Sequence, residues 1–97
     1  MAPVSEITLT ARLAASEWVC EVTVREGGTA SRHRVTVSTE VLERLAPGAT
    51  TPEDLVRRSF EFLLEREPKE SILASFDLPL IARYFPEYEG ELRSQAG

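Results

Sequence analysis

Three segments in the first part of the chain alternate apolar and polar residues, the period of two typical of strands buried on one face. They run from Ile7 to Leu13, from Trp18 to Arg25 and from Ser31 to Val37. Residues 14–17 and the pair Gly27-Gly28 provide the intervening turns, because adjacent glycines tolerate the positive φ of tight hairpins. Short connections favour antiparallel neighbours, so the pattern predicts a three-stranded antiparallel meander over residues 1–38.

A strong helical pattern begins at Thr51. Thr51 can accept a backbone N–H bond as N-cap, and Pro52 suits the first helical position, where no N–H is needed. The apolar side chains of this helix span an arc of roughly 200°, twice the width of the stripe that a helix on one surface requires. We therefore expect it to be covered on two sides and to end near Arg66, before Pro68. These side chains are Leu55, Val56, Phe60, Phe62, Leu63 and Leu64.

Shorter helices are predicted on either side of it. Ser38 can cap one that runs through Leu45, Pro68 can open one that reaches Phe76, and Asp77 can cap another that ends at Phe85. The fold class predicted is α+β in a single domain spanning residues 1–97. The meander fills residues 1–38, a helical half over residues 39–88 packs on one sheet face, and the polar residues 89–97 form a frayed tail.

Two segments in the C-terminal half have distinctive sequences. FLLEREPKESIL occupies residues 62–73, and FDLPLIARYFPEY occupies residues 76–88. Together they resemble a family of short, uncharacterised bacterial proteins. The resemblance implies a bacterial origin and brings no activity with it.

Composition and charge indicate the class of protein, its compartment and the partners that it does not favour. The 97 residues are 42% apolar and 28% charged, which is ordinary for a soluble domain. No apolar run approaches the ~18 residues of a membrane span, and the first residues lack the basic and apolar regions of a signal peptide. Cys20 is the only cysteine, so no internal disulfide can form and we expect a cytoplasmic protein. The net charge of −5 disfavours binding to nucleic acid or to an anionic membrane.

Candidate catalytic chemistry is sparse. One histidine (His33) and one cysteine (Cys20) cannot supply the three or four nitrogen and sulfur ligands of a zinc site. Cys20 alternates with Trp18 and Val22, so we expect it to be a buried, small hydrophobe. No phosphate-binding glycine loop and no nucleophile elbow is present. We predict no enzymatic activity, no catalytic or metal-binding residues and no cofactor.

The function expected is a non-enzymatic protein-interaction or regulatory module whose partner is another protein or a second copy of the chain. Tyr84, Phe85 and Tyr88 lie close together near the end of the chain, and aromatic residues exposed together are typical interface anchors. They form a candidate docking strip. An unpaired sheet edge is the other candidate surface, because its free N–H and C=O groups can pair with a further strand.

A second interpretation starts from residues 32–66. Arg32 to Leu45 resembles the strand and first helix of ribbon-helix-helix DNA-binding proteins, in which strands of two chains enter the major groove together. That resemblance implies a DNA-binding or antitoxin-like dimer in which Arg32, Arg34 and Thr36 face the groove. The match departs in two respects. The first helix has room for about two turns where that family has about three, and a hairpin already pairs the strand.

Overall fold

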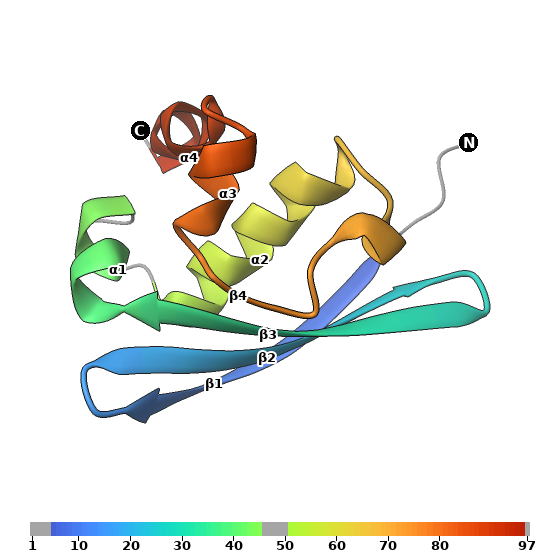
Figure 1. Ribbon diagram of the computed structural model, residues 1–97, viewed down its shortest axis with the longest axis horizontal. Coiled ribbons are helices and arrows are strands. Elements are labelled where there is room, and N and C mark those ends of the chain that lie inside the picture. Colours follow the sequence, from blue (N-terminus) through green and yellow to red (C-terminus); the bar gives the residue numbers. More distant parts are fainter. Residues whose placement is uncertain (1–4, 46–50, 97) are drawn as a thin grey trace.

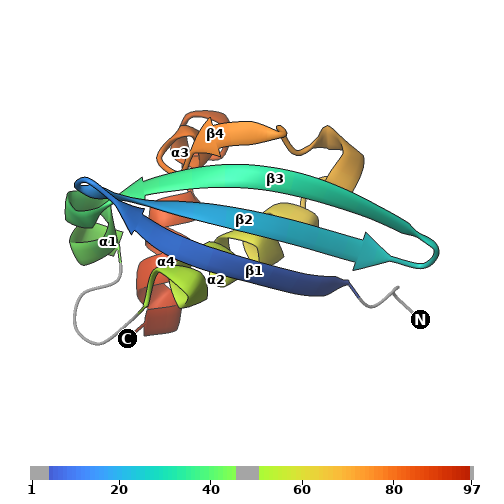
Figure 2. The ribbon, with the colours of Figure 1, turned by 90° about the horizontal axis from the view of Figure 1, so that it is seen from below.

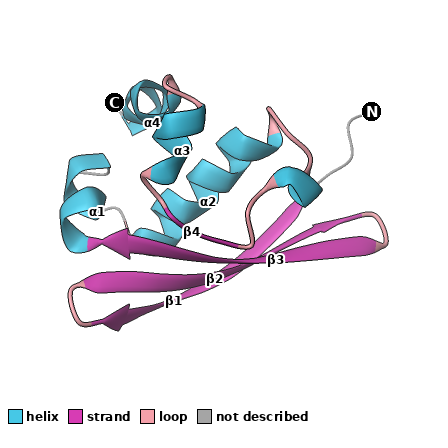
Figure 3. Ribbon diagram, viewed as in Figure 1, coloured by secondary structure: helices cyan, strands magenta, loops and turns pink. Residues whose placement is uncertain are grey.

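The computed structural model describes residues 5–45 and 51–96, with only the backbone course for residues 94–96. One layer is a four-stranded sheet, and the helices lie on one of its faces (Figure 1 and Figure 3). The predicted α+β class is confirmed. The elements in order are β1 (Glu6–Ala14), β2 (Glu17–Glu26), β3 (Thr29–Ser38), α1 (Thr39–Leu45), α2 (Pro52–Leu64), the 3-10 turn η1 (Lys69–Ser71), β4 (Ser75–Asp77), α3 (Leu80–Tyr84) and α4 (Tyr88–Ala96).

The N-terminal strands form the predicted antiparallel meander. Ala15 and Gly27 adopt positive φ in the connecting turns, at 58° and 60°. The alternation assigned from the sequence also holds, because Val22 and Val35 are buried in one core cluster with the apolar residues of α2. The opposite face is polar and carries no helix among the described residues (Figure 2).

The predicted count of three strands is wrong, because residues 75–77 add β4 alongside β3, in parallel. The Arg34 N–H donates to the Ala74 carbonyl at 2.8 Å, and the Leu78 N–H donates to the Thr36 carbonyl at 2.9 Å. Parallel neighbours require a long crossover, which α1 and α2 provide here. The helix predicted from Pro68 to Phe76 is consequently reduced to η1, and Phe76 lies beside Val35 in the sheet.

Helix α2 begins as the sequence predicts, with the Asp54 N–H donating to Thr51 Oγ1 at 3.1 Å and Pro52 in the first turn. Its apolar side chains are buried on two sides, as expected. Phe60 packs toward the sheet, with its ring centroid 5.3 Å from that of His33. Phe62 packs the other way, with its centroid 5.2 Å from that of Tyr88.

The frayed tail predicted for residues 89–97 is wrong over residues 89–96, and Gly97 lies outside the described residues. Residues 88–96 form α4, in which Tyr88 and Leu92 are 0% and 1% exposed. The two side chains are one helical turn apart and therefore share a face. Arg66, two residues after α2, forms ion pairs at the start of α4, with Nε 3.2 Å from Glu87 and a second nitrogen 3.5 Å from Glu91. Asp77 does not cap α3, which instead follows Pro79.

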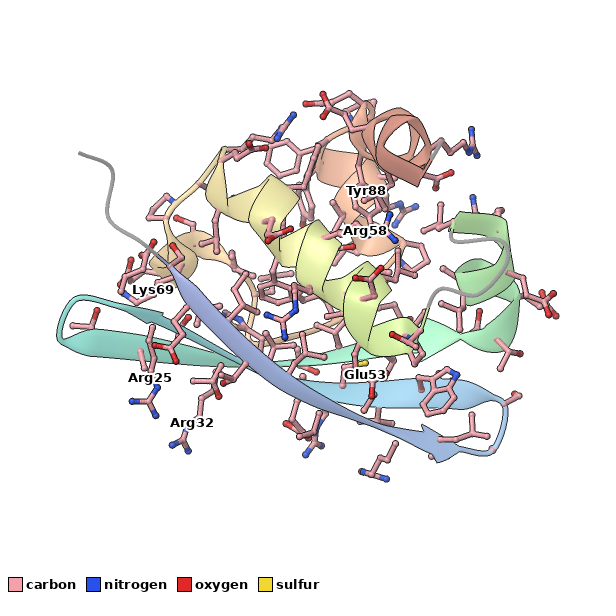
Figure 4. The ribbon with its side chains drawn as sticks, turned by 180° about the vertical axis from the view of Figure 1, so that it is seen from behind. Arg25, Arg32, Glu53, Arg58, Lys69 and Tyr88 are labelled. Carbon is pink, nitrogen blue, oxygen red and sulfur yellow. The ribbon has the colours of Figure 1, made fainter. Side chains whose placement is uncertain are left out.

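A buried hydrogen-bond chain links α4 to α2. Ser59 Oγ donates to the Leu55 carbonyl at 2.8 Å and lies 2.6 Å from the Tyr88 hydroxyl. The serine has one proton, already committed to the carbonyl, so the tyrosine must be the donor in the second bond. Burial raises the pKa of Tyr88, which keeps this donor protonated. Figure 4 shows Tyr88 among the helices, far from the sheet.

This direction of donation predicts an asymmetry between two conservative substitutions. Ser59→Ala leaves a buried Tyr88 hydroxyl without a partner and should lower the free energy of unfolding by about 1–3 kcal/mol. Tyr88→Phe removes only a donor, because Ser59 still bonds to Leu55, and should cost about 0.5–1.5 kcal/mol. Urea unfolding of both variants and of the double variant checks this. An equal or larger loss for Tyr88→Phe would contradict the assigned direction.

Candidate functional site

A groove opens where the C-terminal half folds back over the end of α2. The chain between η1 and β4 forms one wall, α3 forms the other, and the hollow between them has a volume of about 400 Å³. That is within the usual range of ligand and peptide pockets, about 300–1,000 Å³. The lining residues are Leu63, Glu67, Ser71, Ile72, Leu73, Phe76, Leu80, Ile81, Tyr84 and Phe85.

The rim of this groove carries two large, exposed apolar side chains. Tyr84 on α3 is 66% exposed, and Leu73 on the opposite wall is 48% exposed. Glu67 is the one charged residue among those that line the hollow, and it forms no ion pair within the described residues. The groove therefore combines two apolar rim contacts with a single free carboxylate.

His33 fixes the wall that carries Leu73. Its Nδ1 lies 2.7 Å from the Leu73 carbonyl, which can only accept, so this nitrogen carries a proton. The other nitrogen lies 2.8 Å from Ser31 Oγ. The ring is 4% exposed, so both of its polar atoms are used inside the protein. The histidine connects β3 to the groove wall, and both of its nitrogens are hydrogen-bonded within the protein.

The predicted docking strip is divided among three environments. Tyr84 is exposed at the rim, and Phe85 is half-buried with its ring centroid 5.8 Å from that of Phe62. Tyr88 is fully buried and cannot contact a partner in the folded chain, so its inclusion in the strip was wrong. Leu73 was not predicted at the rim, because the local pattern favoured a helix from Pro68 to Phe76 that would include it.

Arg32, Arg34 and Thr36 lie on the open face of the sheet, as the DNA-binding interpretation requires, and Figure 4 shows Arg32 directed away from the helices. Two of these three side chains already bond to other residues of the same chain. Arg34 Nε is 2.8 Å from Glu21, and the Thr36 hydroxyl donates to Asp77. The strand itself is paired with β2 along its length and with β4 at residues 34–36. A two-chain ribbon built on β3 would require this pairing to open.

Cys20 is fully buried in the hydrophobic core. Burial, with smaller contributions from Glu53 and Glu21, raises the pKa of its thiol to about 11. The reactive thiolate is therefore scarce near neutral pH. Within residues 5–45 and 51–96, no three His, Cys, Asp or Glu side chains are grouped so that they could hold a metal ion.

Comparison of the chain with models of known protein families, with curated proteins and with solved structures gives no match. None of the helices in the described part of the chain has the length and apolar character needed to cross a membrane.

The state of Cys20 predicts slow alkylation of the folded protein. At pH 8 a pKa of about 11 leaves about 0.1% thiolate, against roughly a quarter for a free thiol. Iodoacetamide labelling followed by mass spectrometry should be at least about 100-fold slower at Cys20 than at a thiol introduced by Leu13→Cys, a site that is 56% exposed. Equal rates at the two positions would show that the sheet opens readily around Cys20.

Proposed function

We propose that this chain is a non-enzymatic protein-interaction module and that the groove between Leu73 and Tyr84 is its docking surface. The observation that carries the proposal is the exposure of these two large apolar side chains on facing walls of one hollow. Aromatic and aliphatic anchors around a concave site supply most of the free energy in many interfaces. An isolated exposed leucine needs no explanation, but a lined groove with an aromatic rim is typical of a binding site.

The chemistry of the lining indicates the kind of partner. The walls offer contacts for one or two large apolar side chains, and Glu67 offers a carboxylate that has no cation of its own within the described residues. A segment of a partner protein that places an apolar residue beside a lysine or arginine would satisfy both features. Its cation would be attracted to Glu67 in a partly dehydrated setting, where ion pairs are stronger than on an open surface.

Two further observations support an interaction module over an enzyme. Cys20 is buried as a neutral thiol, and both nitrogens of His33 are bonded inside the protein. A cytoplasmic setting is part of the proposal and is supported by the single, buried cysteine. The alternative of a DNA-binding dimer has less support, because Arg34 is neutralised by Glu21 and β3 lies inside the sheet.

The test is selection of displayed random peptides on the immobilised protein. We expect wild type to enrich peptides in which a large apolar residue lies next to a lysine or arginine. Tyr84→Asp should weaken binding of the enriched peptides about tenfold or more, the loss expected for an interface anchor. Glu67→Lys should abolish the preference for basic residues while leaving the apolar preference.

Leu13→Asp is the matched control, since it places the same charge on another exposed leucine, at the far end of β1. It should leave peptide binding unchanged. The proposal fails if wild type enriches no peptide class, or if the enriched peptides bind Tyr84→Asp as well as they bind wild type.

A further inference from the structure

The direction of each backbone group in the sheet can be followed from one edge to the other. The Arg34 N–H and the Thr36 carbonyl bond toward β4, so even-numbered residues of β3 face β4 and odd-numbered ones face β2. The odd residue His33 directs its backbone groups toward β2, and its partner Val22 therefore directs its own toward β3. The even residues of β2 thus face β3, and its odd residues face β1. Thr23 is paired with Thr8, so the even residues of β1 face β2. The odd residues of β1 therefore direct their N–H and C=O groups out of the sheet.

An independent contact agrees with this assignment. Arg57, on α2, donates to the carbonyl of Ile7 at 2.6 Å, as expected for a carbonyl that points away from β2. The outward groups of Leu9, Ala11 and Leu13 bond to no other described residue. Figure 2 shows β1 along one edge of the sheet, opposite β4. A nine-residue edge with unpaired backbone groups is a template for another strand.

We propose that this strand is β1 of a second copy, paired antiparallel about a two-fold axis that passes between the two Leu9 residues. The paired strands would join two sheets into one, with the helices of both copies on the same face. A two-fold interface of this kind is self-complementary by symmetry, so each contact occurs twice. Strand β1 suits this role because it contains no proline, so each of its outward-pointing residues has an N–H group to donate.

The charges on β1 select this register. With the two Leu9 residues opposed, Glu6 lies opposite the partner's Arg12 and Thr8 lies opposite the partner's Thr10. These four side chains are all on the polar face, in the closely spaced, non-hydrogen-bonded pairs of the new ladder. Neither Glu6 nor Arg12 forms an ion pair within the described part of its own chain. In the dimer each Glu6 would form an ion pair with the partner's Arg12, so that two ion pairs cross the axis.

Shifted registers lose this complementarity. Placing Thr10 on the axis sets Glu6 opposite the partner's Ala14, with no opposite charge. Placing Ala11 on the axis brings the two copies of Arg12 into diagonal contact, which is repulsive. The Arg57 bond is compatible with the proposed register, because the Ile7 carbonyl has two lone pairs and Arg57 reaches it from α2 on the helix face.

Charge exchange across the axis tests the proposal. Sedimentation velocity at low salt, from micromolar to millimolar protein, should show wild type dimerising. Arg12→Glu alone and Glu6→Arg alone should each weaken association about tenfold or more, because two attractive pairs become repulsive. The double variant Glu6→Arg/Arg12→Glu restores both pairs and should return the dissociation constant to within about threefold of wild type.

A second variant tests the backbone pairing separately. The Ala11 N–H points outward, so Ala11→Pro costs none of the β1–β2 bonds yet removes a donor from the new ladder, and the folded variant should be monomeric. Arg32→Glu, which reverses a charge on the same polar face but on β3, two strands away from β1, is the control and should dimerise normally. Tyr84→Asp should also dimerise, since the groove adjoins β4 at the opposite edge. A monomeric wild type at millimolar concentration, a double variant as weak as the single ones, or a dimeric Ala11→Pro would each overturn the proposal.

Discussion

Helix α2 has apolar side chains over too wide an arc for one surface to cover, and the rest of the architecture satisfies that constraint. Phe60 is buried against the sheet, and Phe62 is buried against Tyr88 on the other side. Full burial of a side chain of this size is worth about 1.5–3 kcal/mol, so leaving either face in water would remove much of the stability of a small domain. The chain after α2 must therefore turn back over it.

The groove is a consequence of how that return is made. The parallel pairing of β4 with β3 carries the chain along the sheet edge, and α3 then crosses back toward α4. Leu73 and Tyr84 are left facing each other across the end of α2, because neither is needed to cover it. His33 holds the first wall in place from β3. The need to cover the second side of α2 thus explains both the position of the groove and its apolar rim.

Local patterns in the sequence predict the parts of the fold that are held by neighbouring residues. The alternation of Val22 and Val35, the Gly27 turn and the Thr51 cap all have signals within a few residues, and each is where it was expected. Strand β4 has no such signal, since three residues show no period and its partner lies 41 positions earlier, as Val35 pairs with Phe76. The exposure of Tyr84 and the burial of Tyr88 depend equally on this distant packing. Residues 89–96 are mostly polar, so the sequence did not predict a packed helix there. Its buried face consists of only two side chains, Tyr88 and Leu92.

The two proposed surfaces lie at opposite edges of the sheet. The groove adjoins β4, and the strand edge is β1, so one could be occupied without covering the other. A dimer joined through β1 would carry two grooves, one at each end of a continuous sheet. Two linked sites can bind a divalent partner more tightly than either alone, provided that the partner spans them.

The claim that α4 is an integral second cover for α2 is tested most directly by the stability of Leu92→Ala in urea. Leu92 is 1% exposed, so its truncation should lower the free energy of unfolding by about 2–5 kcal/mol in a single cooperative transition. Arg93→Ala, next to it on the exposed face of α4, should change that free energy by no more than about 0.5 kcal/mol. A loss below about 0.5 kcal/mol for Leu92→Ala would contradict the account, since it would mean that α4 does not pack on α2.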